Sequence, residues 1–417
     1  MSTFGSKMLI GMPAAPMTPV TTPFVSASAL HQTQNQTDRL TDIPKCPTWL
    51  VQMEWNENTT LDDVNAKMMS RNIPGIIFVV VQMLLGLVGN GVVILAYWLK
   101  FKRSNYRVYV LFLAFLDLMN CVFTMPFVIV YLVYPKNFPS DFICKAGHFI
   151  GFFGGCASPF VLVLIAMDRF RRICRPFKKQ LTEKQTRITC VVILVITASV
   201  TWFTPLFYGN ERVHTGINNI YEVRCFRSKN PLFYSLSQWY YIILTSLFLI
   251  VTVILFLLYY HIMKTVHRRS RYFSSKQRSP IGGVSKSIQT KKTTVTFMII
   301  TIVYVLSTLV HDSLAMILHM KEDLECIMNF EEGAVYYTFF WTVFLNNVSN
   351  PIIYGISDDR FCSLVKNWMK GLGSAGAVPF DGTKQSSTAS KLSLNAKSSV
   401  EAVRTLSAHT CTKQEKR

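Results

Sequence analysis

Residues 144–176 read CKAGHFIGFFGGCASPFVLVLIAMDRFRRICRP, and this stretch decides the fold. Arg169 follows Cys144 by 25 positions, an interval that an α-helix covers in roughly 37 Å at about 1.5 Å per residue. That length exceeds the roughly 30 Å hydrocarbon core of a bilayer. The stretch therefore predicts a helix that crosses a membrane, with Cys144 at an oxidising face and the basic cluster after Asp168 in the cytoplasm.

The composition agrees with a membrane protein. Half of the 417 residues are hydrophobic and only 16% are charged, whereas soluble proteins carry about 25% charged residues. Because membrane helices pair their backbone internally, apolar segments of this kind predict helices. We expect an all-α membrane protein with a seven-transmembrane helix bundle, whose apolar segments are residues 73–99, 107–133, 144–168, 188–208, 233–263, 293–318 and 334–356.

The distribution of charge predicts the orientation. In a soluble protein a net charge of +20 would indicate nucleic-acid binding. With the N-terminus outside, however, the cytoplasmic segments hold 31 of the 43 Lys and Arg residues, as the positive-inside rule requires. We therefore predict a plasma-membrane protein that contacts membrane lipids and no nucleic acid. Its predicted parts are an extracellular tail over 1–72, the bundle over 73–356, a short amphipathic helix over 357–370 and a disordered cytoplasmic tail over 371–417.

Several polar side chains interrupt the apolar segments. A polar group inside a membrane helix is costly and usually faces the interior of the bundle. Pro351 also loosens the last segment, because a proline frees backbone carbonyls. The side chains expected to meet inside the bundle are Asn90, Asp117, Ser158, Asn346 and Asn350.

Five motifs occur in order on the predicted helices: Gly89-Asn90, Leu113-Ala114-x-x-Asp117, Cys144, Asp168-Arg169-Phe170 and Asn350-Pro351-x-x-Tyr354. Over residues 73–370 the chain resembles the rhodopsin-like G-protein-coupled receptors. The resemblance implies a receptor that signals to a heterotrimeric G protein. Arrestin and receptor kinases would act through the Ser- and Thr-rich tail. No cluster of residues at nucleophile or metal spacing points to an enzyme.

The resemblance also implies roles for individual residues. Arg169 would be held by Asp168 in the inactive state and would turn toward the G protein on activation, as part of a switch made of Asp168, Arg169, Tyr259, Asn350, Pro351 and Tyr354. A sodium site at Asp117 would be lined by Asn90, Asp117, Ser158, Asn346 and Asn350, whose oxygen atoms suit a hard cation. The alternative is a hydrogen-bonded network with water and no ion. No other cofactor is expected.

The sequence departs from the family in ways that bear on activation. The sixth segment has Thr308 where an aromatic switch residue is usual, and Val310 where a proline is usual. Pro159 instead interrupts the third segment. A proline removes a helix hydrogen bond and bends the helix. An acidic residue that would hold Arg169 is also absent, since Thr290 stands at the expected position.

Four cysteines lie outside in the predicted topology. By the resemblance, Cys144 pairs with Cys225. The even number then argues that Cys46 and Cys326 form a second disulfide, which would hold the N-terminal tail over the mouth of the bundle. Two free thiols are the alternative. Asn35 and Asn58 stand in glycosylation sequons on the same side.

The class of ligand is inferred from the residues in the extracellular half of the predicted bundle and its loops. Gly151 occupies the position of the aspartate that binds amines in the family, and residues 334–356 contain no Lys that could hold retinal. Two β-prone segments about Gly216 predict a hairpin. A broad, charged mouth favours a neuropeptide or peptide hormone, with His311, Asp312 and Glu222 as candidate contacts. The alternatives are a receptor for a lipid or another small molecule, and a weakly signalling scavenger receptor.

Overall fold

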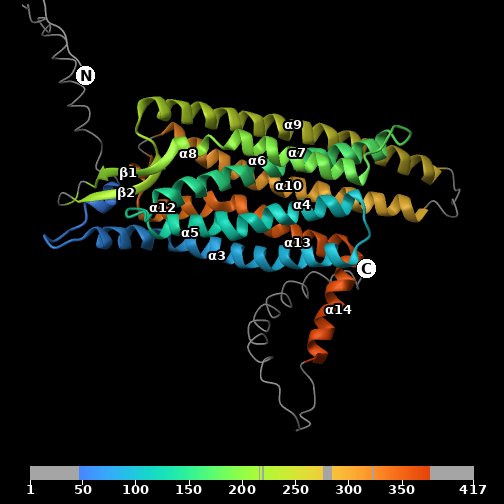
Figure 1. Cartoon of the computed structure of the whole chain (residues 1–417), viewed down its shortest axis with the longest axis horizontal. Coiled ribbons are helices and arrows are strands. Elements are labelled where there is room, and N and C mark those ends of the chain that lie inside the picture. The colour runs from blue at the N-terminus through green and yellow to red at the C-terminus, as the bar shows by residue number, and fades with distance from the viewer. Residues whose placement is uncertain (1–46, 216, 218–219, 276–283, 322–323, 376–417) are drawn as a thin grey trace, which may run out of the picture. The chain divides into compact units, whose positions relative to one another are not determined.

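The structure, a computed structural model, describes residues 47–375 apart from 216, 218–219, 276–283 and 322–323. Long helices run side by side and form a bundle (Figure 1). Six of them are long and apolar enough to cross a bilayer. Four are single helices and two continue into a second helical piece; together they comprise α3 (Leu61–Lys100), α4 (Asn105–Met119) with α5 (Met125–Val133), α6 (Asp141–Cys174), α7 (Glu183–Thr201) with α8 (Thr204–Phe207), α9 (Pro231–Ser275) and α10 (Val284–Met320).

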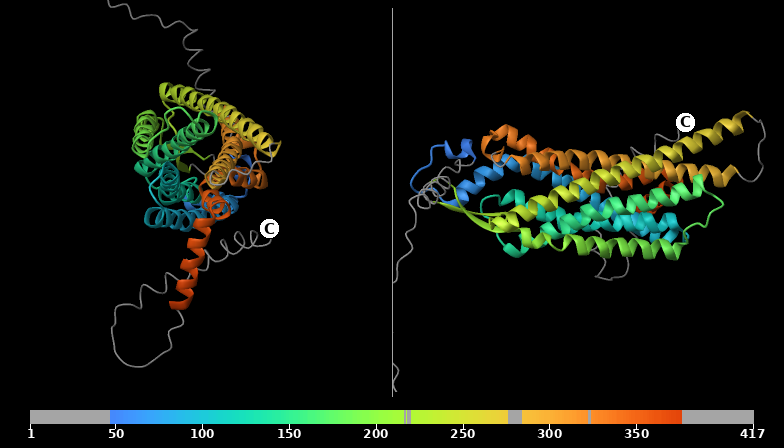
Figure 2. Two further views of the ribbon diagram at one scale, coloured as in Figure 1. Left: turned by 90° about the vertical axis from the view of Figure 1, so that its right-hand side faces the viewer. Right: turned by 90° about the horizontal axis from the view of Figure 1, so that it is seen from above.

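The seventh predicted span is divided. It consists of α12 (Phe330–Phe340), a 3₁₀ turn η2 (Trp341–Phe344) and α13 (Leu345–Ser357). The predicted amphipathic helix is α14 (Asp359–Ala375), which leaves the bundle at an angle (Figure 2). The seven-helix, all-α class is confirmed. The tail beyond residue 375 lies outside the described residues.

The first helix begins earlier than predicted. Residues up to 72 were assigned to the tail, yet α3 starts at Leu61. Thr60 caps it, and Thr60 and Asp63 form a reciprocal capping box, a signal that fixes a helix start independently of hydropathy. The polar side chains of Arg71 and Asn72 are buried, so this first part of the helix packs against protein.

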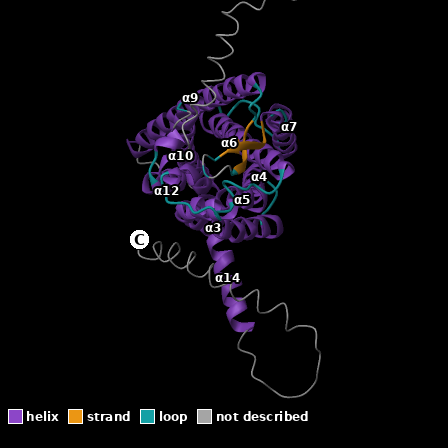
Figure 3. Ribbon diagram, turned by 90° about the vertical axis from the view of Figure 1, so that its left-hand side faces the viewer, coloured by secondary structure: helices purple, strands orange, loops and turns teal. Residues whose placement is uncertain are grey.

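The predicted hairpin is confirmed. Strand β1 (Tyr208–His214) pairs antiparallel with β2 (Tyr221–Arg227), in a register that places Asn210 opposite Cys225. When the bundle is viewed along its helices from the end that carries the hairpin, the strands lie over the ring of helices (Figure 3). We call this the hairpin end of the bundle, and the end that carries Arg169 and α14 the α14 end.

Two irregular segments interrupt the second and the seventh spans. A π-helical turn, η1 (Asn120–Thr124), separates α4 from α5, and η2 separates α12 from α13. Gly154 on α6 faces η1 so closely that an added Cβ would lie 2.4 Å from Asn120 Oδ1. The glycine therefore allows α6 to approach the wider π turn.

Candidate functional site

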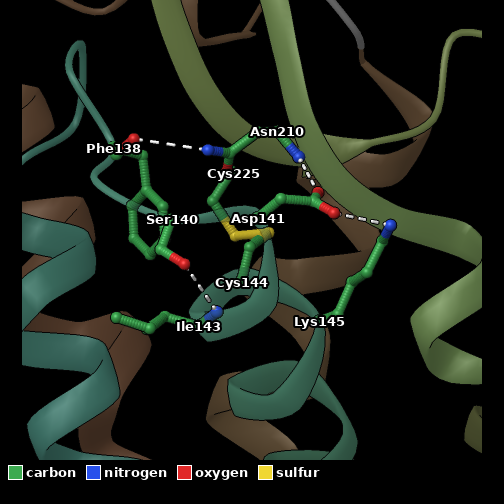
Figure 4. Close-up of a disulfide and its surroundings, with 8 residues drawn as sticks. All are labelled: Phe138, Ser140, Asp141, Ile143, Cys144, Lys145, Asn210 and Cys225. Carbon is green, nitrogen blue, oxygen red and sulfur yellow. Dashed lines mark hydrogen bonds and ion pairs between the residues drawn. A yellow bond between two sulfur atoms is a disulfide. The ribbon is translucent and has the colours of Figure 1, made fainter.

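A disulfide anchors the hairpin to the start of α6. Cys144 is bonded to Cys225, and both residues are buried. Around the bond, the backbone N–H of Asn210 donates to Asp141 Oδ1 at 2.8 Å, and the other oxygen of Asp141 pairs with Lys145 Nζ at 2.7 Å (Figure 4). These contacts fix the hairpin across the mouth of the helix ring.

A cavity of about 290 Å³ lies inside the bundle, toward the hairpin end. Most of its lining is apolar or aromatic, and α6 and α10 contribute much of it. Asp312 is the one carboxylic acid among the described lining residues, and no Lys or Arg is among them. His311, beside it, lies with Nδ1 2.6 Å from the carbonyl oxygen of Phe340. The structure thus brings two of the three predicted ligand contacts, His311 and Asp312, to one cavity.

The third predicted ligand contact lies elsewhere. Glu222 does not line the cavity. It is buried, with only 2% of its side chain exposed, and pairs with Lys136 Nζ at 2.8 Å and Arg224 Nε at 2.6 Å. Its carboxylate is occupied by these two ion pairs, so the role of Glu222 as a ligand contact stays a prediction.

The N-terminal segment contacts the loop before α12. Thr48, in the short helix α2 (Thr48–Val51), donates its hydroxyl to the carbonyl oxygen of Cys326 at 2.8 Å. Trp49 packs edge-on against Phe330, with ring centroids 5.3 Å apart. Cys326 is disulfide-bonded, but Cys46 and Asn35 lie outside the described residues, so the Cys46–Cys326 pairing stays a prediction. Asn58 is exposed just before α3.

The predicted polar residues form a buried network in the middle of the bundle. Asn350 donates its side-chain N–H to Asp117 Oδ2 at 2.6 Å. Pro351 has no N–H to give to the carbonyl oxygen of Asn347, four residues earlier. The side-chain amide of Asn90 supplies the missing hydrogen bond, because it donates to the Asn347 carbonyl oxygen at 2.8 Å. An added Cβ on Gly89 would lie 2.8 Å from the Pro351 ring, so the Gly89-Asn90 pair fits α3 to the proline of α13.

The network offers oxygen atoms to a cation. The side-chain oxygens of Asn90, Asn346 and Asn350 are buried, and none has a hydrogen-bond partner among the described residues. With the carboxylate of Asp117 they make a set of hard donors that fits a small cation. Ser158 is placed less directly, because its hydroxyl donates to the carbonyl oxygen of Gly154 at 3.1 Å within its own helix. Asn346 and Ser158 also line the cavity, so the network begins at the cavity wall.

At the α14 end, Asp168 holds its neighbours. Its carboxylate lies 3.4 Å from Arg169 Nη2 and accepts a hydrogen bond from Arg172 Nε at 2.8 Å. Asn105 on α4 donates to its other oxygen at 3.3 Å. Asp168 is fully buried and the Arg169 side chain is 6% exposed. The predicted pair is thus present and shielded from solvent.

Arg169 also reaches α10 without an acidic partner there. Its Nη1 lies 3.4 Å from the Thr293 hydroxyl, and its guanidinium stands 5.6 Å from the centre of the Phe297 ring. Tyr259 on α9 lies 3.3 Å from the hydroxyl of Thr301 on α10. Tyr354 is fully buried. The sequence does not predict the contact at Thr293, since the family pattern places the missing acid at Thr290, whose side chain is not among those the structure describes.

These features are those of one family. The model of that family, described as "7 transmembrane receptor (rhodopsin family)", matches residues 89–354, more than half of the chain. The chain belongs to the rhodopsin family of seven-transmembrane receptors. It is therefore a multi-pass membrane receptor and not an enzyme.

Individual relatives of this receptor are more distant. Neuropeptide FF receptor 2 of Mus musculus is 26% identical over 267 residues, which cover 61% of this chain and 62% of that protein. A QRFP-like peptide receptor of Branchiostoma floridae is 28% identical over 36% of this chain and 39% of its own length. Lysophosphatidic acid receptor 6 of Gallus gallus is 32% identical over 34% and 46% respectively. The chain thus spans less than two thirds of each of these relatives.

Sequence reasoning missed the aromatic wall of the cavity and a buried charge cluster at the hairpin end. Tyr241 stacks on His319 with centroids 4.1 Å apart, and Tyr208 stacks on His148 at 3.9 Å. Aromatic residues are frequent throughout the spans, so no sequence signal separates these from packing residues. For the charge cluster a signal existed: Lys136 is the first charged residue after the second span, next to Pro135.

Proposed function

We propose that this receptor binds a peptide at the hairpin end, outside the cell, and activates a heterotrimeric G protein at the α14 end. The observation that carries the proposal is the path of α6. It lines the cavity with residues from Gly147 to Phe160 and continues to Asp168 and Arg169. One continuous helix therefore joins the cavity to the charged pair that the family uses for coupling. The proposed location is the plasma membrane, with arrestin and receptor kinases acting on the C-terminal tail.

The electrostatics of the cavity favour a basic group on the ligand. Asp312 is an acidic group in a largely apolar wall, and its ionised form is stabilised most by a cationic group of the ligand that enters the cavity. Relatives whose names include neuropeptide FF and a QRFP-like peptide support the peptide class. A basic residue of the peptide would meet Asp312, while the rest of the peptide would contact the hairpin.

A lipid receptor is the second candidate, since one relative is named for lysophosphatidic acid. A ligand with an anionic head group would need a cation in the cavity. Among the described lining residues the charged position is the carboxylate of Asp312, which would repel such a group. The charge of the cavity therefore ranks this candidate below the peptide. The intact Asp168–Arg169 pair ranks a weakly signalling scavenger receptor lower still.

The test is a signalling assay in cells that express the receptor on their surface, challenged with a peptide extract before and after protease treatment. We expect a dose-dependent response that protease abolishes. Asp312→Asn should weaken the response of a basic active peptide about 10–100-fold, as expected for the loss of a charge-assisted contact worth about 1.5–3 kcal/mol, whereas Asp312→Glu should retain part of it. A response that survives protease and appears in the lipid fraction would instead establish the lipid reading.

We also propose that the network at Asp117 binds sodium as an allosteric ion. Asp117 would supply the charge, and Asn90, Asn346 and Asn350 would supply neutral oxygens. The ion would add a countercharge to a carboxylate that lies in the middle of the membrane. Replacing sodium by the larger N-methylglucamine should lower the thermal stability of the purified receptor but not that of the Asp117→Asn variant. Equal sodium responses in the two proteins would contradict the assignment.

A further inference from the structure

A cluster of five charged side chains is buried at the hairpin end, apart from the main cavity. Its ion pairs are Lys136–Glu222 at 2.8 Å, Arg224–Glu222 at 2.6 Å, Arg224–Glu325 at 3.5 Å and Arg71–Glu325 at 3.9 Å. The members come from α3, from the loop after α5, from β2 and from α11 (Leu324–Ile327). The cluster therefore connects four elements that lie far apart in the sequence.

The charges of the cluster do not balance. Among the described residues, three cations, Arg71, Lys136 and Arg224, face two carboxylates, Glu222 and Glu325. The exposed fractions of Arg71 and Lys136 are 1% each, and that of Glu222 is 2%. Arg224 and Glu325 are about one fifth exposed. An uncompensated charge at such depth costs several kcal/mol, so the excess positive charge has to be removed or neutralised.

Two physical routes remove the excess. Lys136 can release its proton, because burial and the nearby Arg224 lower its pKa despite the attraction of Glu222. Alternatively, an anion can join the cluster. The two routes make different predictions, since only the second depends on which anion the solution contains.

The geometry favours the anion. A small cavity of about 20 Å³ is lined by Arg71, Arg224, Glu325 and Tyr337, with Asn72 also in its wall. Arg71 Nη1 is buried and has no hydrogen-bond partner among the described residues. A guanidinium has no acceptor and can only donate, so this N–H calls for an anion or another acceptor. One water-sized particle needs roughly 10–15 Å³ of this kind of space, so the cavity has room for one small particle and no more.

We propose that this cavity binds a monovalent anion of the size of chloride, held by Arg71 and Arg224. The anion would complete the charge balance of the cluster at three positive and three negative charges. It would also join α3 to the hairpin strand β2 and to α11, beside the disulfide residue Cys225, which lines the same cavity. Anion binding would thus stabilise the arrangement of the hairpin and the loop before α12 around the mouth of the receptor.

The experiment is a thermal unfolding series on the purified full-length receptor in sodium chloride, sodium bromide and sodium gluconate. Sodium concentration and ionic strength are held constant, so that the site at Asp117 and general screening contribute equally. Chloride and bromide should raise the midpoint of unfolding by about 2–4 °C in a saturable way, as mass action predicts for an ion present at about ten times its dissociation constant. Gluconate should not, because it is too large for the cavity. Equal midpoints in all three salts would overturn the proposal and leave neutral Lys136 as the explanation.

Three variants locate the effect. Arg71→Gln should lose the chloride response. Glu325→Gln removes a competing carboxylate and should lower the chloride concentration at half effect about threefold to tenfold. Lys67→Gln removes an exposed cation of α3, four residues before Arg71, and should respond like the unaltered receptor. A full response in Arg71→Gln would show that the anion binds elsewhere. Should that variant not fold, an unchanged half-effect concentration in Glu325→Gln would equally refute the site.

Discussion

The contact between Arg169 and Thr293 predicts that one substitution can tighten the inactive state. The hydroxyl of Thr293 lies 3.4 Å from Arg169 Nη1, at the long limit for a hydrogen bond. In Thr293→Asp a carboxylate oxygen would stand one bond further along the side chain and would approach the guanidinium. The variant would then have a charge-assisted contact between α6 and α10 that the natural sequence lacks.

The size of the effect follows from the burial of Arg169. Hydrogen bonds to charged groups contribute about 1.5–3 kcal/mol. The lower value is appropriate, since Arg169 already has Asp168 beside it and Thr293 is only half-buried. About 1.5 kcal/mol corresponds to a roughly tenfold shift in a two-state equilibrium. Basal signalling should therefore fall about tenfold, and the midpoint of thermal unfolding should rise by about 2–4 °C.

The matched control is Thr293→Asn, which has nearly the same shape and helix propensity without the charge. Both variants would be compared for surface expression, for signalling without ligand and for thermal stability after purification. The stability measurement needs no ligand and no basal signal. If Thr293→Asp and Thr293→Asn unfold at the same temperature and signal equally, the side chain at position 293 does not pair with Arg169.

Three further predictions follow from the same contacts. Arg169→Ala should abolish G-protein activation at normal surface expression; undiminished signalling would contradict its role. Cys46→Ser and Cys326→Ser should each weaken ligand binding, and the double variant should be no worse than either single one, because two cysteines of one bridge do not act additively. The Tyr97 hydroxyl donates to Asp358 Oδ2 at 2.9 Å. Tyr97→Phe should therefore lower the free energy of unfolding by about 0.5–1.5 kcal/mol, the usual contribution of one hydrogen bond. An unchanged unfolding midpoint would show that this bond does not stabilise the junction with α14.

The features that the sequence predicted well depend on local pattern. Membrane helices follow from length and hydropathy, so the positions of six spans agree with the structure to within a few residues at most ends. The hairpin follows from β-prone segments about Gly216. Hydropathy alone places the start of α3 too late, because the capping box at Thr60 and Asp63 determines where the helix begins.

The features that were missed depend on contacts between distant segments. Glu222 carries no sign in the sequence that it pairs with Lys136, which lies on another loop. Likewise, nothing local marks Asn120 as the start of a π turn, because the turn is matched by Gly154 on a different helix. Arg169 was assigned an absent acid at Thr290 by position alone, and only the packing of α10 shows that Thr293 is the residue in contact.

The irregular backbone of this receptor is gathered around the main cavity. The π turn contributes Asn120 and Thr124 to the wall, and the 3₁₀ turn contributes Trp341 and Phe344. Pro159, which lies inside α6 and cannot donate a helix hydrogen bond, lines the same cavity. Helix α10, by contrast, runs unbroken from Val284 to Met320 without a proline. A ligand that enlarges or fills the cavity would therefore act first on segments whose hydrogen bonding is already irregular, since these change conformation at the least cost. In this receptor we expect the backbone to change in α6 and in the turn between α12 and α13, rather than at a bend in the sixth helix as in other family members. Helix α10 would then move as one unit, because Thr308 and Asp312 contact the ligand cavity.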